Sequence, residues 1–153
     1  MVSVMLHVSA KANYALRALV VLSTHPSGQP IKTAEIAACE GMPLKFLENI
    51  LVDLRRKGLV TSARGPTGGF RLSRAADLIT VADVLQAVDG PLSDAHDALD
   101  GDSRSRLQRV WVAAESSLRS VLEIVTLADL VCDVLPDHVD ELLGGETLAD
   151  LFT

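Results

Sequence analysis

The sequence predicts a mostly α-helical protein with one small β-hairpin, and two stretches of the chain carry that prediction. In residues 43–57, apolar side chains recur at steps of three and four, as on one face of a helix, and two short strand-like runs follow. In residues 104–128, apolar side chains again follow steps of four and three, as along the seam of a coiled coil. With 153 residues, 48% of them hydrophobic, the chain is long enough for one packed domain and an oligomerisation arm.

The first part of the chain predicts two helices joined by a loop. Ser9 is a suitable N-cap for a helix that runs to about residue 24, with a broad apolar surface that favours a place in the core. Residues 25–30 contain two prolines and a glycine, which is the composition of a loop. Thr33 then begins a short helix that runs through residue 40.

A tight turn at residues 41–42 leads into a second helix, residues 43–57. Pro43 stands where a first-turn proline is tolerated, and Gly58 is placed to end the helix as a C-terminal cap. The apolar positions share one face of this helix: Leu44, Leu47, Ile50, Leu51 and Leu54. A helix, a tight turn and a second helix form the unit that lays its second helix in the major groove of DNA.

Residues 59–63 and 70–73 are the two strand-like runs, and the glycine-rich tip Arg64-Gly65-Pro66-Thr67-Gly68-Gly69 separates them. A helix pair followed by such a hairpin predicts a winged helix-turn-helix, with residues 43–57 as recognition helix and residues 64–69 as wing. We assign residues 1–90 to this DNA-binding domain. Met5 could serve as the start of the chain as well as Met1.

The second half of the chain predicts further helices. Thr80 and Asp83 form a capping-box-like start for a helix to about residue 88, and residues 91–103 are an acidic loop with four aspartates. We expect a dimerisation helix at residues 104–128 and a C-terminal helical tail at 129–153. A helix opened by Thr126 is expected to end near Leu135-Pro136.

The predicted seam of the dimerisation helix consists of Leu107, Trp111, Ala114, Leu118, Val121 and Val125. A single helix reached through a loop cannot bury such a seam within a small winged-helix domain, so pairing of two copies is favoured. The alternative is packing of the seam against the first helix of the same chain.

Charge is distributed unevenly along the chain. Residues 1–80 carry ten Lys or Arg and five acidic residues, a net charge of +5, whereas residues 81–153 carry four and fifteen, a net charge of −11. The positive half favours contact with nucleic acid, because phosphates attract local positive charge and a distant acidic segment need not cancel it. An ordinary solvated basic surface is the alternative.

Several functional classes are disfavoured. We expect a cytoplasmic protein, since no apolar run approaches the ~20 residues that span a bilayer and no signal peptide is evident. We do not expect an enzyme, because the four histidines are scattered and no catalytic arrangement has recognisable spacing. Two cysteines, Cys39 and Cys132, lie too far apart for a zinc motif, and each is either a core residue or a redox-sensitive thiol.

Four segments together resemble the Rrf2 family of bacterial transcription regulators. They are SAKANYALRALVVL, then IAACEGMPLKFLENILVDLRRKGLVTSARGPTGGFRLSR, then ITVADVLQAVDG with the later SLRSVLEIVTLADL. The resemblance spans roughly residues 7–131, and its most specific part is the LxxxGLVxSxRGxxGGFxL pattern at residues 54–72.

The resemblance implies a homodimer that binds partly palindromic double-stranded operator DNA, most often as a repressor. Lys45, Phe46 and Glu48 would lie at or near base edges, with Phe46 alternatively in the core, and Arg64 would enter the minor groove. Phosphate contacts are expected from Lys11, Arg55, Arg56 and Lys57. The full set of candidate DNA-binding residues is Ser9, Lys11, Thr33, Lys45, Phe46, Glu48, Asn49, Arg55, Arg56, Lys57, Arg64, Gly65, Thr67 and Gly68.

The chain also departs from the family. Members that sense through an iron-sulfur cluster hold it with three closely spaced cysteines, and the corresponding loop here, residues 91–103, contains none. We therefore expect no iron-sulfur cluster and no metal site; His96 is the remaining nitrogen donor in that loop. The signal would come from a small-molecule effector or a partner protein. The alternative function is a protein-protein interaction module that kept the fold and docks a partner through its acidic C-terminal half.

Overall fold

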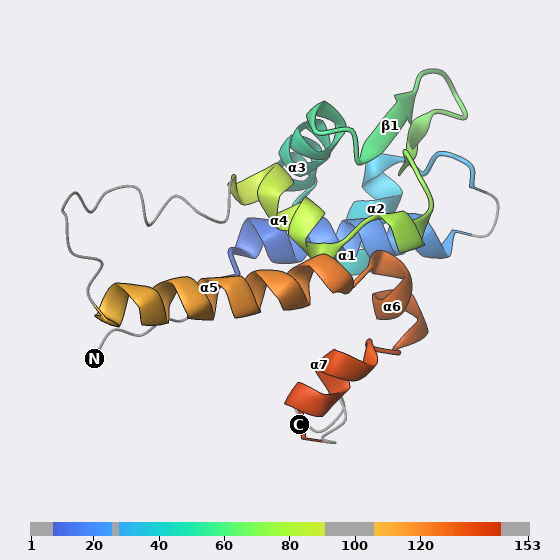
Figure 1. Ribbon diagram of the computed structural model, residues 1–153. Coiled ribbons are helices and arrows are strands. Elements are labelled where there is room, and N and C mark those ends of the chain that lie inside the picture. The colour runs from blue at the N-terminus through green and yellow to red at the C-terminus, as the bar shows by residue number, and fades with distance from the viewer. Residues whose placement is uncertain (1–7, 26–27, 91–105, 145–153) are drawn as a thin grey trace.

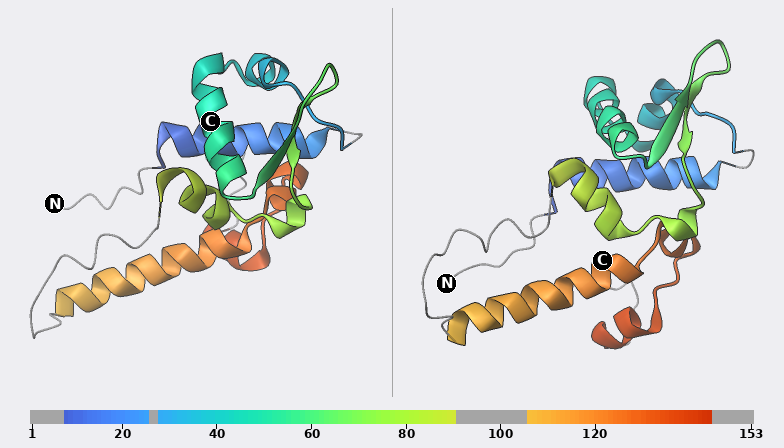
Figure 2. Two further views of the ribbon diagram at one scale, coloured as in Figure 1. Left: turned by 90° about the horizontal axis from the view of Figure 1, so that it is seen from above. Right: turned by 45° about the horizontal axis from the view of Figure 1, so that its top comes forward.

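A computed structural model describes residues 8–25, 28–90 and 106–144 of the chain (Figure 1). The helix α1 lies between the α2–α3 pair and the long helix α5 in Figure 1 and in the right view of Figure 2. The helices are α1 (Ala10–Thr24), α2 (Thr33–Glu40), α3 (Leu44–Arg56), α4 (Val81–Asp89), α5 (Arg106–Ile124), α6 (Leu127–Cys132) and α7 (Asp137–Leu142). The strands are β1 (Val60–Ala63) and β2 (Gly69–Leu72), and η1 (Ala76–Leu78) is a short 3-10 helix. The predicted mostly helical fold with one hairpin is confirmed.

Helix α1 begins after Ser9, the N-cap that the sequence predicts. The hydroxyl of Ser9 accepts a hydrogen bond from the backbone N–H of Ala12 at 2.9 Å, which satisfies one of the free donors of the first turn. Three alanines at steps of three, Ala12, Ala15 and Ala18, are fully buried. Because their side chains are small, α2, α3, α4 and α6 can pack around α1.

The helix-turn-helix consists of α2 and α3. Gly41, at φ 62°, ends α2, and Pro43 is the N-cap of α3 rather than a residue of its first turn. The C-terminal end of α3 is a Schellman motif: Leu59 N–H donates to the Leu54 carbonyl at 2.9 Å, and Gly58 N–H donates to the Arg55 carbonyl at 3.0 Å. The chain therefore leaves α3 in a fixed direction and enters the hairpin at once.

The wing is the antiparallel hairpin of β1 and β2, in which Val60 faces Leu72 and Ala63 faces Gly69. A further bridge that the sequence analysis missed adds Ile31 to its edge. The N–H groups of Ile31 and Phe70 each donate to the carbonyl of the other at 2.8 Å. The wing is thus hydrogen-bonded to Ile31, two residues before α2, so its base is fixed to the helix-turn-helix.

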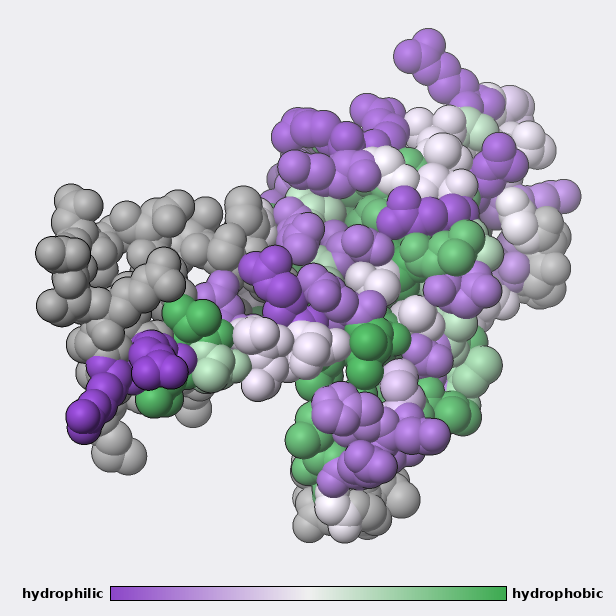
Figure 3. All heavy atoms as spheres, viewed as in Figure 1, coloured by the Kyte–Doolittle hydropathy of each residue, from purple (hydrophilic) through white to green (hydrophobic). Residues whose placement is uncertain are grey.

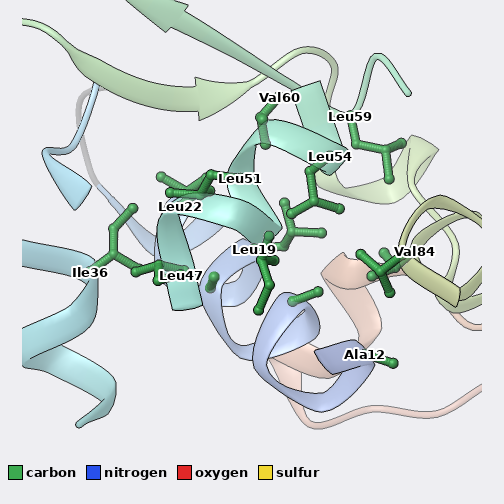
Figure 4. Packing of buried hydrophobic residues seen from close by; sticks show 14 of the residues in the cluster. Ala12, Leu19, Leu22, Ile36, Leu47, Leu51, Leu54, Leu59, Val60 and Val84 are labelled. Atoms are coloured by element: carbon green, nitrogen blue, oxygen red, sulfur yellow. The ribbon is translucent and has the colours of Figure 1, made fainter. Parts of the chain in front are cut away.

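One core holds these elements together. Leu19 of α1 and Leu47, Leu51 and Leu54 of α3 are fully buried and belong to the same cluster as Val84 of α4 (Figure 4). The apolar face predicted for α3 is confirmed except at Leu44, which is 46% exposed. Because α3 turns four apolar side chains inward, its polar residues are left on the outer surface.

Two capping boxes join the second half of the chain to the winged domain. At α4, Thr80 accepts from Asp83 N–H and the Asp83 carboxylate accepts from Thr80 N–H; Thr126 and Asp129 repeat this arrangement at α6. The two N-caps lie opposite each other as an antiparallel bridge. Val81 N–H donates to the Val125 carbonyl, and Leu127 N–H donates to the Ile79 carbonyl, each at 2.9 Å. We call this paired structure the capping-box joint.

The long helix α5 differs from the predicted helix 104–128 at its C-terminal end. The helix ends at Ile124, because Val125 and Thr126 leave it to form the capping-box joint. Val125 is 6% exposed within the chain and is no longer part of the predicted seam. The C-terminal part of α5 packs against α4, and its N-terminal part projects beyond the winged domain (Figure 2).

Two further expectations for the C-terminal segment need correction. Helix α6 ends at Cys132, not near Leu135, because Asp133 adopts a left-handed conformation at φ 54°. Helix α6 is also more than a tail: it packs against α1, and Leu127 at its start is fully buried in the core of the winged domain. The predicted acidic loop 91–103 and the last residues of the tail, 145–153, lie outside the described residues.

Candidate nucleic-acid interface

The outer face of α3 carries the polar residues that the sequence analysis assigned to base contact. Lys45 is 87% exposed in its side chain, and Asn49 is also exposed. Glu48 is half-buried and forms an ion pair with Lys45, Nζ to Oε2 at 3.3 Å. Lys45 and Glu48 thus lie side by side one turn apart, with an ammonium that can donate and a carboxylate that can accept at base edges.

Phe46 is turned toward the domain interior rather than outward. Its ring is half-buried against the core and meets the ring of Tyr14 edge to face, with centroids 5.5 Å apart. Such a pair contributes beyond simple burial to the attachment of α3 to α1. The structure supports the core alternative for Phe46 and gives it no evident access to a base edge.

The C-terminal end of α3 presents three exposed cations, Arg55, Arg56 and Lys57. The guanidinium of Arg55 donates to the hydroxyl of Ser62 on β1 at 3.2 Å, which ties the recognition helix to the wing. Thr33 is half-buried at the first residue of α2.

The wing tip presents Arg64, Gly65 and Thr67 to solvent. Gly68 is buried, and a side chain there would overlap the Ala63 carbonyl oxygen across the tip. At Gly69, φ is 152°, and a side chain would overlap the Ile31 carbonyl. The glycines therefore allow a tight tip that displays Arg64. In Figure 1 the tip and α3 lie at the same end of the molecule, and Figure 3 shows hydrophilic residues gathered there.

Two basic residues near this surface were missed from the sequence. Arg71 is exposed on β2, where its guanidinium donates to Thr61 Oγ1 at 3.4 Å, and Lys32 is exposed at the N-cap of α2. The alternation of burial along β2 would have placed Arg71 outward, because neighbours in a strand face opposite sides. The exposure of Lys32 could not be predicted from the sequence, because it depends on the bridge between Ile31 and Phe70 that fixes the loop before α2.

Two residues expected at the DNA surface are engaged within the chain instead. The hydroxyl of Ser9 donates to the Asp89 carboxylate at 2.7 Å, and the ammonium of Lys11 lies 2.7 Å from Asp53 Oδ2 and 3.0 Å from the Val88 carbonyl. The hydrogen bond from Lys11 holds the pKa of Asp53 below its ordinary value, with added attraction from the charges of Lys11 and Arg56. Both residues join the N-terminus of α1 to the end of α4.

No metal site is assembled by the described part of the chain, where no three His, Cys, Asp or Glu side chains gather. Cys39 on α2 and Cys132 at the end of α6 are both exposed, so the core alternative is wrong for each. The whole chain has two cysteines, which cannot supply three thiolates to a cluster. Among the described helices, none is long and apolar enough to cross a membrane.

A helix-turn-helix with an exposed polar second helix, and a hairpin that displays an arginine beside it, define a winged helix-turn-helix DNA-binding protein. The chain belongs to the Rrf2 family, whose model, described as an iron-dependent transcriptional regulator, matches residues 8–133. It is therefore a DNA-binding transcriptional regulator and not an enzyme, as the sequence resemblance predicts.

Known proteins of this kind match over most of their length. A Mycobacterium tuberculosis protein named as an HTH-type transcriptional regulator is 46% identical over 142 residues, 90% of this chain and 88% of its own. The solved structure of CymR, the global cysteine regulator of Bacillus subtilis, is similar with a TM-score of 0.75 and 30% identity, covering 84% of this chain and 98% of that one. IscR from T. potens gives a TM-score of 0.69 and 32% identity, covering 82% and 86%.

Proposed function

We propose that the chain is a homodimeric repressor that binds a partly palindromic operator, with α3 in the major groove and the wing in the minor groove. The observation that carries this proposal is the common placement of the exposed polar face of α3 and the Arg64 tip at one end of the molecule. A helix in one groove and a hairpin beside it can then touch adjacent grooves of one duplex. Since its target is the chromosome, we place the protein in the cytoplasm.

Base contacts are assigned to the middle of α3 and to the wing tip. Lys45 would donate to guanine, Glu48 would accept from cytosine N4, and Asn49 is a further base-edge candidate. Arg64 would enter the minor groove, whose negative potential is greatest where the groove is narrow. Gly65 and Thr67 would contact the sugar-phosphate backbone beside it.

Phosphate contacts are assigned to Arg55, Arg56 and Lys57, which follow one another at the exposed end of α3. Thr33 at the start of α2 is a further candidate, since the free N–H groups of a helix N-terminus favour phosphate. These contacts add affinity without reading sequence. Repression would follow from occupancy of the operator.

The dimer is assigned to α5. Trp111, Leu118 and Val121 are half-buried in the single chain, and Ala114 beside them is exposed. Leu107 lies in the first turn of α5, although its side chain is outside the described residues. Two copies joined through these residues would match the two-fold symmetry of a palindromic operator.

The salt dependence of DNA affinity tests the proposal. We would measure binding to the DNA upstream of the chain's own gene by fluorescence anisotropy at several potassium chloride concentrations. Several phosphate contacts predict an affinity that falls steeply with salt, with a slope of roughly −0.9 per contact. A flat response would contradict DNA binding by this surface and favour the alternative, a module that docks a partner through the acidic C-terminal half.

We further propose that the regulator works without an iron-sulfur cluster and responds to a small molecule or a partner protein. The chain offers two cysteines, and they lie on different helices. Protein purified without oxygen is expected to be colourless, because thiolate-bound clusters absorb visible light. The same sample should bind the upstream DNA. A brown sample would contradict this proposal and leave the DNA-binding assignment intact.

A further inference from the structure

Lys11 lies in the first turn of α1 and contacts two other helices through one ammonium group. Its Nζ is 2.7 Å from Asp53 Oδ2 on α3 and 3.0 Å from the Val88 carbonyl in the last turn of α4. The side chains of Lys11 and Asp53 are only 33% and 26% exposed. Two of the three N–H groups of this ammonium are therefore donated within the chain.

Asp53 is a carboxylate on the helix that carries the proposed DNA contacts. Its other oxygen, Oδ1, is 3.4 Å from Nη1 of Arg56, whose side chain is 71% exposed. A carboxylate near phosphates repels them, and an aspartate three residues before an arginine on a helix attracts that arginine. The carboxylate thus competes with phosphate for Arg56, and the strength of the competition depends on how well Asp53 is neutralised elsewhere.

We propose that Lys11 is a positioning residue for DNA binding, which neutralises Asp53 and so leaves Arg56 available to a phosphate. This inference rests on the proposed DNA contact by the end of α3. It replaces the expectation that Lys11 itself contacts phosphate. A direct contact would break a 2.7 Å ion pair and a hydrogen bond to Val88, and would leave Asp53 unpaired beside the DNA.

The same ammonium holds α3 in place. Its bonds to Asp53 and Val88 join the last part of α3 to the last turn of α4 through the N-terminus of α1. The bond from Ser9 to Asp89 joins the same two ends of α1 and α4 a second time. Loss of Lys11 would therefore both release Asp53 and loosen one of two polar links, and the experiment must separate these effects.

Charge-pair rescue separates them. The variants are Lys11→Met, Asp53→Asn and the double variant, each measured for DNA affinity against salt and for unfolding by urea. Lys11→Met is expected to bind DNA about tenfold more weakly, with a salt slope lower by about one. The reason is that the Asp53 carboxylate, no longer neutralised by Lys11, pairs with Arg56 and keeps it from a phosphate. Asp53→Asn should bind more tightly than wild type. The double variant should regain the wild-type slope and come within about threefold of its affinity, since neither charge remains.

Arg56→Gln supplies a second readout. It should lower the DNA affinity of the otherwise wild-type protein several-fold. In the Lys11→Met background it should lower the affinity little further, because Arg56 is already paired with Asp53 there. If the double variant Lys11→Met/Asp53→Asn stays as weak as Lys11→Met while folded, Lys11 contacts DNA or acts only through packing, and the inference is overturned. Full additivity of Arg56→Gln and Lys11→Met would overturn it as well. An absence of salt-dependent binding by the wild type would instead overturn the proposed DNA surface itself.

Discussion

At the scale of single residues, Arg64 is an exposed side chain at the tip of the wing. It is exposed on a tip that two buried or strained glycines hold close to the hairpin. An arginine displayed in this way can reach a groove without moving the domain that carries it. The contribution of Arg64 to binding can therefore be measured with little effect on folding.

We expect Arg64→Ala to weaken operator binding by roughly 1–3 kcal/mol, the usual effect of losing one good base contact. Affinity would be measured by anisotropy, and urea unfolding should show stability within about 0.5 kcal/mol of wild type, as for most surface substitutions. The control is Arg109→Ala, which removes an exposed arginine from α5. Equal affinities of the two variants would remove Arg64 from the interface.

Asp53 gives a prediction for the pH dependence of stability. Because the hydrogen bond from Lys11 lowers its pKa in the folded state, the pair stabilises the fold above the ordinary carboxyl pKa of about 3.9, and this contribution is lost as pH falls through the lowered value. Asp53→Asn should therefore lose less free energy of unfolding than wild type between about pH 6 and pH 3. Urea unfolding across this range would show it, and Lys11→Met should likewise flatten the profile. Parallel profiles for all three proteins would contradict a stabilising pair.

At the scale of elements, the wing depends on close backbone contact with Ile31, two residues before α2. Gly69→Ala would place a side chain against the Ile31 carbonyl at a φ of 152°, so the two hydrogen bonds between Ile31 and Phe70 should break. Hydrogen exchange should become faster at these two amides, and DNA affinity should fall. Thr67→Ala, at the exposed tip, is the matched control and should leave exchange at Ile31 and Phe70 unchanged. If the amides of Ile31 and Phe70 stay protected in Gly69→Ala, the wing accommodates the added side chain without losing these hydrogen bonds.

The elements that could be predicted from the sequence are those whose formation depends on residues close to them in the chain. Periodicity placed α3, and the caps at Ser9, Thr80 and Thr126 placed three helix starts within a residue. The end of α5 was missed because Val125 continues the apolar spacing of the helix, while the hydrogen bonds that pull it into the capping-box joint come from residues more than forty positions away.

Contacts between distant residues were the part of the site that could not be predicted. Lys11 and Asp53 are 42 positions apart, and nothing in either neighbourhood distinguishes a lysine paired with an aspartate from one facing a phosphate. Phe46 shows the same limit, because its place on α3 fits either a base edge or the ring of Tyr14. Helical spacing orders residues around one helix, but their partners depend on how the helices pack.

At the scale of the whole molecule, the proposed DNA surface and the helices α6 and α7 lie at opposite ends. The proposed DNA surface lies with α3 and the wing, and Figure 1 places α6 and α7 at the opposite end. Residues 120–153 contain no Lys or Arg. The acidic residues of α6 and α7 are thereby kept away from the proposed DNA surface, so the net charge of −6 does not oppose DNA binding there as strongly as its size suggests.

We expect Leu118→Asp to give monomers that bind operator poorly, because a charge in the middle of the proposed α5 interface would be buried without a partner. Sedimentation would report the oligomeric state, and anisotropy would report binding. The same substitution at Leu78, which is 62% exposed on η1, is the control and should leave assembly intact. A Leu118→Asp protein that remains dimeric would show that α5 does not join the two copies.

The capping-box joint fixes the angle at which the long helix leaves the winged domain. Four backbone groups, from Ile79, Val81, Val125 and Leu127, form hydrogen bonds across it. The joint therefore holds α5 at a fixed angle to the winged domain. In a dimer built through α5, the distance between the two recognition helices would then be a constant of the protein. One base pair inserted at the centre of an operator turns its half-sites by about 34° relative to each other, and the DNA, rather than the protein, would have to twist to restore both contacts.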